Sequence, residues 1–444
     1  MKKFKNSRDS IVSEVLLWQE VPTQVVVKET YNLKVHPIAS LYNEGTINFD
    51  IPAQPKGMMS NIDIITTFNV KKGNNNLTED NNCTIINNFT NALWDLVDVK
   101  LSDRISLMQS MRKSYAYQTF FNYSLNSDAD REDYLYCTQL FKMGSAKTKA
   151  AADLPVFTGE NIVNEAAVER AKRIANSRSV TVSSRLHSPL FTTSKALPTN
   201  MEIRVSLSKN TDKFLLIADG NDYTVNIENV YLDVSYIRPH DIFLSMIEER
   251  LAKEAAPYFI TRPEIIIKPI AQSGRIVRIN HIFPGNLPKH AFFTVQKSKD
   301  FEGTFNSNPF AFIPFAKFQL YIDGMPYFID PLEIDHIMEG GLRVYRENRV
   351  FMQQLYKTIG KDVKGCGLIN STNFQQHFMV GVSLSGDRSS SMAPYLNPQG
   401  VASSQLELDF GYDTNVTDDL ILMVYAVFDR VIKISSTREI EIIE

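Results

Sequence analysis

Short runs in which apolar and polar residues alternate recur along most of this 444-residue chain. The clearest is 201–207, where Met, Ile, Val and Leu occupy every second position. A period of two is the signature of a strand with one buried face. Asp219-Gly220 and Asp323-Gly324 follow such runs, and Asp-Gly favours a tight hairpin because glycine tolerates a positive φ. The pattern therefore predicts an all-β fold of antiparallel strands.

Strands are predicted in both halves of the chain, at the spacing of successive antiparallel neighbours. In the first half we expect them at 25–27, 33–35, 46–51, 62–70, 96–101, 201–207, 214–217 and 223–236. In the second half we expect them at 264–270, 275–282, 291–296, 315–322, 378–384, 405–410 and 420–434. The last of these, LILMVYAVFDRVIKI, is apolar almost throughout, as is typical of a strand buried on both sides.

Helical patterns interrupt the strands. Residues 158–177 place apolar side chains on one helical face, with Thr158 as the N-cap. Residues 241–256 are amphipathic, and 342–359 carry a weaker apolar stripe. The apolar side of 241–256 is formed by Ile242, Met246, Ile247 and Leu251. The aromatic-rich stretch 111–125 fits either a helix or a strand.

The chain is too long for one ordinary core, so two or three domains are expected. Many short strands with turns between them fit a sandwich or jelly roll. We predict two tandem eight-stranded antiparallel jelly rolls, a double jelly roll, with helical insertions in loops. The expected division is an N-terminal arm and lead-in at 1–40, a first jelly roll at 41–238, a linker helix at 239–258, a second jelly roll at 259–436 and a C-terminal tail at 437–444.

The charge pattern argues against extensive nucleic-acid binding. The formal net charge is −3, and phosphate contacts need clustered Lys and Arg. The exception is the N-terminus, with Lys2, Lys3, Lys5 and Arg8. It is either a solvated end or an inward-facing arm with weak contact to a genome. No apolar run reaches a membrane span, and the three separated cysteines, Cys83, Cys137 and Cys366, indicate free thiols in a reducing compartment.

No catalytic constellation is evident from spacing, so we predict no enzyme and name no catalytic, cofactor-binding or metal-binding residue. The seven histidines are scattered without HxH or HExxH, which argues against a metal-binding two-domain cupin. The run 142–148 (KMGSAKT) lacks the frame of a phosphate loop. No GxSxG motif provides a nucleophile elbow.

Several separated pieces, taken in order, resemble one family. They are VPTQVVVKETYNLKVHP, GTINFDIPA, the strand at Ile62-Asp63-Ile64, LWDLVDVKLSDR, the Tyr-rich 112–125 with Tyr115-Ala116-Tyr117, SSRLHSPLF, LPKHAFF, Gly303, Asn308-Pro309-Phe310, Phe312 and Asp323-Gly324. This order is similar to that of the double jelly-roll major capsid protein of Polinton/Maverick elements and adintoviruses. The resemblance covers most of residues 20–435. His187 and the lack of Asn-Gly after Leu101 depart from the family pattern.

The resemblance implies a structural major capsid protein. Three copies would form a homotrimer, a pseudo-hexameric capsomer that tiles an icosahedral virion shell. The implied partners are neighbouring capsomers, a single jelly-roll penton (vertex) protein and minor capsid proteins. The implied location is the virion capsid, after synthesis in the host cytoplasm, with the nucleus as one place of assembly.

Two alternatives stay open from the residues alone. One is a two-domain jelly-roll enzyme, of the copper-dependent or glycan-cleaving kind, which stoichiometric bound metal would favour. The other is a domesticated transposon-derived binding protein with the same fold. The genes beside the coding sequence would separate a virion protein from a domesticated copy.

Overall fold

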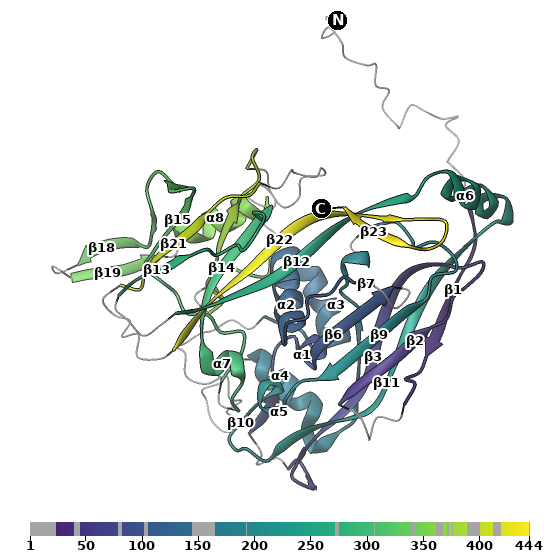
Figure 1. Ribbon diagram of the computed structural model, residues 1–444. Helices are drawn as coiled ribbons and strands as arrows, with labels where there is room; N and C mark the ends of the chain where they lie inside the picture. Colours follow the sequence, from purple (N-terminus) through teal and green to yellow (C-terminus); the bar gives the residue numbers. More distant parts are fainter. Residues whose placement is uncertain are drawn as a thin grey trace, which may run out of the picture.

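The computed structural model describes residues 24–39, 45–78, 82–101, 105–143, 165–191, 193–270, 275–305, 307–339, 342–347, 349–360, 367–370, 373–374, 376–388, 400–411 and 419–443. Strands take up 44% of the structure and helices 22%, so the fold is mainly β, as predicted. All paired strands in the described part of the chain are antiparallel, and helices lie between them along the sequence (Figure 1).

The strands of the first half form two main sheets and a short pair. In the larger sheet, the order is β1 (Val27–Val35), β11 (Tyr223–Pro239), β3 (Met58–Lys72) and β4 (Asn75–Asn76), with β8 (Val180–Arg185) also paired to β3. In the other, the order is β2 (Thr46–Ile51), β9 (Ile203–Lys209), β6 (Trp94–Leu101) and β7 (Ile105–Ser106). The short pair is β5 (Cys83–Ile85) with β10 (Leu216–Ala218).

The strands of the second half repeat this arrangement and add a hairpin. One sheet runs β12 (Ala256–Ile270), β22 (Leu420–Ile434), β14 (His290–Lys297) and β20 (Val380–Ser383), with β23 (Ile440–Ile443) on β22. The other runs β13 (Ile276–Asn280), β21 (Ser404–Asp409), β15 (Lys317–Ile322) and β16 (Met325–Pro326), with β17 (Leu332–Glu333) on β15. The hairpin is β18 (Asp335–Glu339) with β19 (Leu342–Glu347).

Among the strands described, no sheet combines strands from both sides of helix α6 (Asp241–Lys253). Figure 1 shows β1, β2, β3, β9 and β11 on the right and β13, β15, β18, β19 and β21 on the left. Strand β1 lies within 1–40 and pairs with β11, and β23 lies within 437–444 and pairs with β22. The segments at both ends of the chain therefore contribute strands to the sheets.

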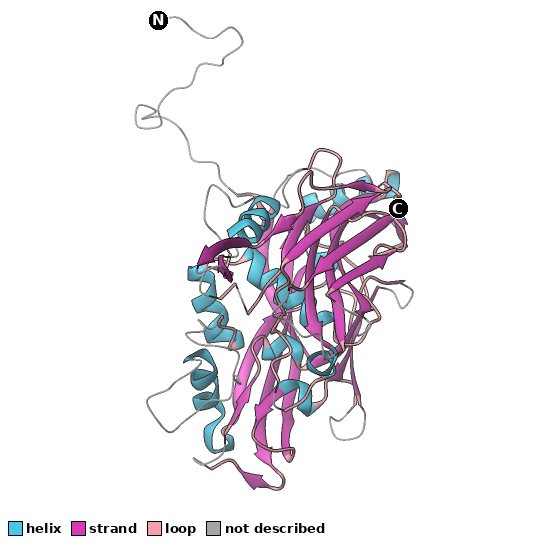
Figure 2. Cartoon of the chain, turned by 90° about the vertical axis from the view of Figure 1, so that its left-hand side faces the viewer, coloured by secondary structure: helices cyan, strands magenta, loops and turns pink. Residues whose placement is uncertain are grey.

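The remaining helices lie in the connections between strands. They are α1 (Phe89–Ala92), α2 (Ser114–Asn126), α3 (Ala129–Gln139), α4 (Glu165–Ile174), α5 (Asp212–Leu215), α7 (Ser298–Glu302) and α8 (Arg349–Ile359), with 3-10 turns at Ala175–Ser177 and Pro189–Phe191. Figure 2 shows several helices along one side of the strands. Buried apolar side chains of both halves form one continuous cluster, which includes Phe49 in β2 and Leu422 in β22.

Two predicted elements are wrong. Residues 342–347 form strand β19 and not the start of a helix, which begins only at Arg349. The backbone there pairs with β18, from Glu339↔Leu342 to Asp335↔Glu347, and this pairing outweighs a weak apolar stripe. Phe214 and Leu215 belong to helix α5 and not to a strand, because the strand that pairs with β5 begins only at Leu216.

Other predictions are adjusted in their bounds. The two short strands expected at 25–27 and 33–35 are one strand, β1, and the helix expected at 241–256 ends at Lys253. The ambiguous stretch 111–125 is largely helix α2. Helix α4 begins at Glu165 among the described residues, and the proposed N-cap Thr158 lies outside them. Strand β12 extends past the predicted 264–270 and contains Pro263 and Pro269, which an edge strand tolerates.

Candidate functional site: the junction between the two halves

Helix α2 lies at the junction of the two halves and is buried on nearly every side. Of its thirteen residues, all but Asn122 and Asn126 are buried. A helix that is buried all round must lie in the interior of a large protein. The residue before it, Lys113, has a φ of 63°, so the chain turns sharply into the helix. Helix α2 therefore has neighbours from both halves.

Aromatic side chains of α2 stack on rings of the second half. The rings of Phe120 and Phe310 are 4.4 Å apart and nearly parallel, at 9°. Phe121 stacks on Phe312 at 5.7 Å and on Tyr425 at 5.2 Å. Such pairs contribute roughly 0.5–1.5 kcal/mol each beyond the area that they bury. They make α2 a hydrophobic link between the two halves.

Tyr117 adds a buried polar contact to the same link. Its hydroxyl donates to the carbonyl oxygen of Pro309 at 3.0 Å, and the Gln296 amide donates to the same oxygen at 2.7 Å. The Tyr117 ring stacks on Phe301 at 5.6 Å. Burial raises the pKa of Tyr117 well above its usual range, so the hydroxyl stays protonated and remains a donor.

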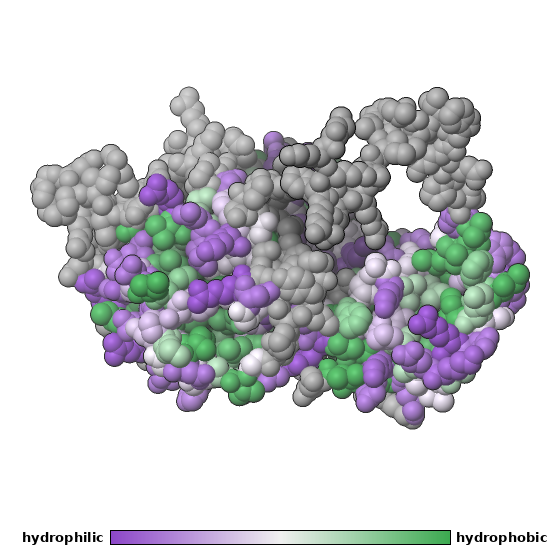
Figure 3. Space-filling model, turned by 90° about the horizontal axis from the view of Figure 1, so that it is seen from above, coloured by the Kyte–Doolittle hydropathy of each residue, from purple (hydrophilic) through white to green (hydrophobic). Residues whose placement is uncertain are grey.

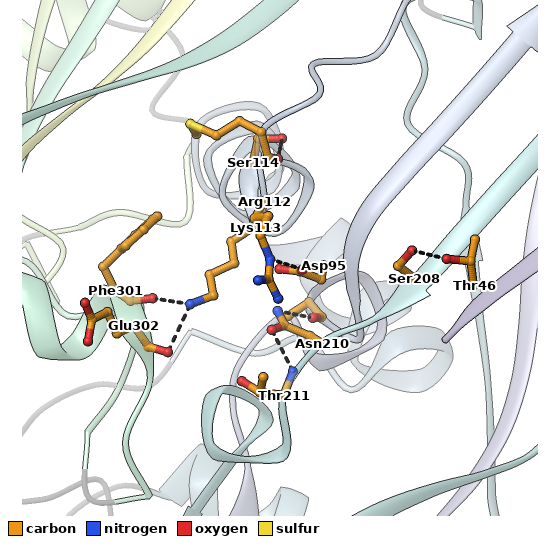
Figure 4. A network of polar contacts seen from close by, with 12 residues as sticks. Thr46, Asp95, Arg112, Lys113, Ser114, Ser208, Asn210, Thr211, Phe301 and Glu302 are labelled. Atoms are coloured by element: carbon orange, nitrogen blue, oxygen red, sulfur yellow. Dashed lines mark hydrogen bonds and ion pairs between the residues drawn. The ribbon is translucent and has the colours of Figure 1, made fainter. Parts of the chain in front are cut away.

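Lys113 connects the start of α2 to helix α7 (Figure 4). Its Nζ donates to the carbonyl oxygens of Phe301 at 2.9 Å and Glu302 at 3.0 Å. It also lies 5.0 Å from the ring centroid of Phe214. Burial lowers the pKa of Lys113, although nearby Asp95 opposes this shift. The ammonium group therefore caps the end of α7 and supports the junction electrostatically.

Next to Lys113, Arg112 points toward Asp95, and its Nε lies 2.6 Å from Oδ2. The Asp95 carboxylate is almost buried, whereas Arg112 is largely exposed. Because a buried carboxylate without a charge partner is costly, Arg112 stabilises the turn that leads into α2.

Two glutamines of the first half bind the exposed backbone of strand β12. Gln109 donates to the carbonyl of Ile265 at 2.7 Å and accepts from its amide at 2.9 Å. Gln118 donates to the carbonyl of Pro263 at 3.1 Å. Unpaired edge strands invite pairing with another chain. At these positions, side chains of the first half form hydrogen bonds with the backbone groups on the open edge of β12.

Gly303 allows a close backbone approach between the halves. Its φ is +89°, and a Cβ at this position would lie 2.8 Å from the Cα of Phe214. Nearby, the amide of Ala218 donates to the carbonyl of Phe305 at 2.7 Å. A side chain at 303 would therefore push the two halves apart.

A second contact between the halves lies near α6. Arg438 Nη2 donates to both carboxylate oxygens of Glu248, at 2.7 and 3.0 Å, and its Nε donates to the carbonyl of Thr199 at 2.7 Å. Burial alone would raise the pKa of Glu248, but the hydrogen bonds from Arg438 and Thr199 hold that pKa below its usual value. This contact joins the C-terminal hairpin to α6 and to the first half.

The structure brings together some of the motif residues and not others. Pro309, Phe310 and Phe312 contact Tyr117, Phe120 and Phe121 of α2 at the junction. Gly303 lies against Phe214 of α5. Asp323-Gly324 lies apart, in the turn between β15 and β16, where Asp323 accepts from the amide of Ser403. Lys113 and Gln109 were not identified from the sequence, because their partners lie more than 150 residues away.

The histidines do not gather in the part of the chain that the structure describes. Within it, no group of three His, Cys, Asp or Glu side chains could hold a metal ion. His187 contacts Tyr123 of α2, with 2.6 Å between Nε2 and the hydroxyl oxygen, and His377 contacts the carbonyl oxygen of Phe310 at 2.9 Å. Ring nitrogens of His290 have no hydrogen-bond partner among the described residues.

Other predicted features lie partly outside the described residues. Lys142, the first residue of the 142–148 loop, forms an ion pair with Glu169 at 2.9 Å, whereas 144–148 are not described. The basic residues of the N-terminus and Cys366 are not described either, while Cys83 is buried and Cys137 is exposed. Of the helices described, none is long and apolar enough to cross a membrane.

Comparison with known proteins identifies the fold. No protein-family model and no curated protein sequence matches this chain. Among solved structures, a chain of the Sputnik virophage matches with a TM-score of 0.61 and 12% identity, covering 99% of this chain and 93% of that chain. The mavirus major capsid protein matches with a TM-score of 0.55 and 11% identity over 100% and 96% of the two chains. The Faustovirus major capsid protein matches with a TM-score of 0.55 and 7% identity over 94% and 92%.

At such low identity these similarities describe the fold. They cover both halves of the chain in one alignment, so the similarity of fold extends over the whole molecule and is not limited to one sheet. The fold is all-β, a double jelly roll with helices between strands, as predicted.

Proposed function

We propose that this chain is a structural major capsid protein that builds an icosahedral virion shell. The observation that carries the proposal is the similarity over nearly the full length to the major capsid proteins of mavirus and Faustovirus and to a chain of the Sputnik virophage. The buried junction supports it, because a shell tile must hold its two jelly rolls in a fixed relation. The proposed role is structural and includes no catalysis.

The proposed building block is a homotrimer. We assign 41–238 and 259–436 as the two jelly rolls, with 239–258 as the linker. Three chains with two similar β units each would present six roughly equivalent sides, which suits a pseudo-hexameric capsomer. The glutamines bound to the edge of β12 support this role, because they limit unwanted strand pairing between tiles.

The proposed partners are neighbouring capsomers, a penton protein at the vertices and minor capsid proteins. The basic N-terminal residues would add a weak contact with the genome. The proposed location is the virion capsid, after synthesis in the host cytoplasm and with assembly in the nucleus as one route.

The test is the mass and shape of the purified protein. We expect native mass measurement to give three times the 50.5 kDa of the chain, and negative-stain images to show hexagonal particles. Co-expression with a vertex protein should produce closed shells. A chain that stays monomeric at high concentration and never enters particles would contradict the proposal. Stoichiometric transition metal in the purified protein would favour the enzyme alternative.

A further inference from the structure

Helix α6 leaves most of its apolar side chains exposed or only half-buried. Seven of its thirteen residues are apolar, in the sequence DIFLSMIEERLAK, yet only Leu251 is buried. Ile242 is 75% exposed and Met246 is 58% exposed. Figure 3 shows hydrophobic residues grouped at the right-hand end of the molecule, where Figure 1 places α6. An exposed cluster of large apolar side chains is typical of an interaction surface.

The start of the described chain extends this surface. The carbonyl of Val26 accepts from the amide of His240 at 3.0 Å, which places it directly beside the first residue of α6. Val25 is 59% exposed and Val26 is 42% exposed. We call Val25, Val26, Ile242 and Met246 the α6 face. The chain that precedes residue 24 therefore enters the structure next to this face.

The residues before this point have the composition of a covering helix. Residues 10–21 read SIVSEVLLWQEV, with Glu14 and Glu20 as the only charges. Ile11, Val15 and Trp18 follow the spacing of one helical face. A helix of this length spans about 18 Å and α6 about 20 Å, at ~1.5 Å per residue, so the two match in length.

We propose that residues 10–21 of the same chain pack as a helix against the α6 face, antiparallel to α6. Only residues 22–25 separate the segment from Val26, which lies beside the start of α6, so the segment can reach the α6 face. So short a connection keeps the segment at a high local concentration near its own α6, which favours it over a segment from another copy. The antiparallel arrangement also places opposite ends of the two helix dipoles together. The inference does not depend on the proposed shell role.

Trp18 provides a direct readout. The chain has two tryptophans, and the other, Trp94, is fully buried. Subtracting the emission of a Trp18→Phe variant from that of the unchanged chain isolates the Trp18 spectrum. We expect this spectrum at shorter wavelength than that of free tryptophan, with weak quenching by iodide. Met246→Glu should shift it to longer wavelength and increase quenching several-fold.

Met325→Glu is the matched control, because Met325 is 71% exposed in the turn region of β15 and β16, in the second half. It should leave the Trp18 spectrum unchanged. The proposal would be overturned if the Trp18 spectrum of the unchanged chain matched that of free tryptophan. It would also be overturned if the spectrum of a buried Trp18 did not change in Met246→Glu. A Trp18 spectrum that changes on dilution would assign the α6 face to the segment of another copy and would also overturn it.

Discussion

Helices α2 and α6 have the same length of thirteen residues and opposite environments. Helix α2 is rich in aromatic side chains and is buried on almost all sides between the two halves. Helix α6 is rich in aliphatic side chains and buries only Leu251. Both lie where the chain passes between sheets. The contrast teaches that apolar content alone does not decide burial, because burial needs a partner surface within reach.

The two helices are also attached to the molecule differently. Helix α2 is held by stacked rings, such as Phe120 on Phe310. The contacts of helix α6 include the buried Leu251 and the ion pair of Glu248 with Arg438. The first kind of contact depends on packing, whereas the second depends on charge. Mutations and pH should therefore affect the two helices unequally.

The largest expected difference comes from removing a ring. Phe120→Ala should lower the free energy of unfolding by about 3–5 kcal/mol, because it leaves a cavity against Phe310. Phe243→Ala on α6 is the matched change at a less buried site, and we expect it to cost no more than about 1 kcal/mol. Denaturant unfolding of both variants measures the difference. Equal losses would contradict the contrast between the helices.

Acid should act first on the α2 side. Burial lowers the pKa of His187 from 6.5 to about 4, and Arg131 and Arg185 add to this shift. The ring therefore binds a proton more readily in the unfolded chain than in the folded chain, and acid favours unfolding. The contribution of the neutral ring to the free energy of unfolding is complete above pH 6.5. It is lost progressively as the pH falls toward 4, by up to about 1.4 kcal/mol per pH unit.

Glu248 on α6 also loses its stabilising effect in acid, but over a lower pH range, because its folded pKa lies below the usual 4.5. Its stabilising effect is present above pH 4.5 and is lost only as the pH falls through the folded pKa. Thermal unfolding between pH 7 and pH 5 should therefore depend on His187 and not on Glu248. His187→Gln should reduce the change of the unfolding temperature with pH over this range. A Glu248→Gln variant with an equal effect would refute the assignment.

A smaller effect is expected where Gly303 lies close to the backbone of Phe214. Gly303→Ala should cost about 1–3 kcal/mol, because the new Cβ meets the backbone of Phe214 and the positive φ is strained. Gly324→Ala is the control, since its φ is +75° with open space around the Cβ position. It should cost about 1–2 kcal/mol from strain alone. Denaturant midpoints give the loss of unfolding free energy in each variant. The extra loss in Gly303→Ala over Gly324→Ala measures the effect of the contact with Phe214.

The smallest effect is expected at the attachment of α6. Arg438→Gln should cost about 1 kcal/mol, because the ion pair with Glu248 is partly exposed to solvent. High salt should reduce the loss, since it screens the pair in the unchanged protein. Urea unfolding at low and high salt measures both quantities. A loss as large as that of Phe120→Ala would remove the distinction between the two kinds of attachment.

Much of the fold was predictable from local pattern. Strand β22 matches the predicted 420–434, because its long apolar run has few alternatives. Strand β9 was also found, since Ile203, Val205 and Leu207 alternate cleanly. The pattern failed for β19, where hairpin pairing with the neighbouring β18 outweighs a weak apolar stripe, and for the short helix α5, which covers only Asp212–Leu215. The junction was not predictable, because Gln109 meets Ile265 across 156 residues.

The sequence by itself determined the alternation that makes this protein all-β, the helix between the two sets of sheets and the order of the family-like motifs. These follow from short-range physics, the period of the backbone and the conformational limits of glycine and proline. The tertiary structure alone decided that α2 is enclosed and α6 exposed, and that Lys113 caps α7. Those outcomes depend on which distant surfaces come into contact, and residue spacing along the chain does not encode that contact directly.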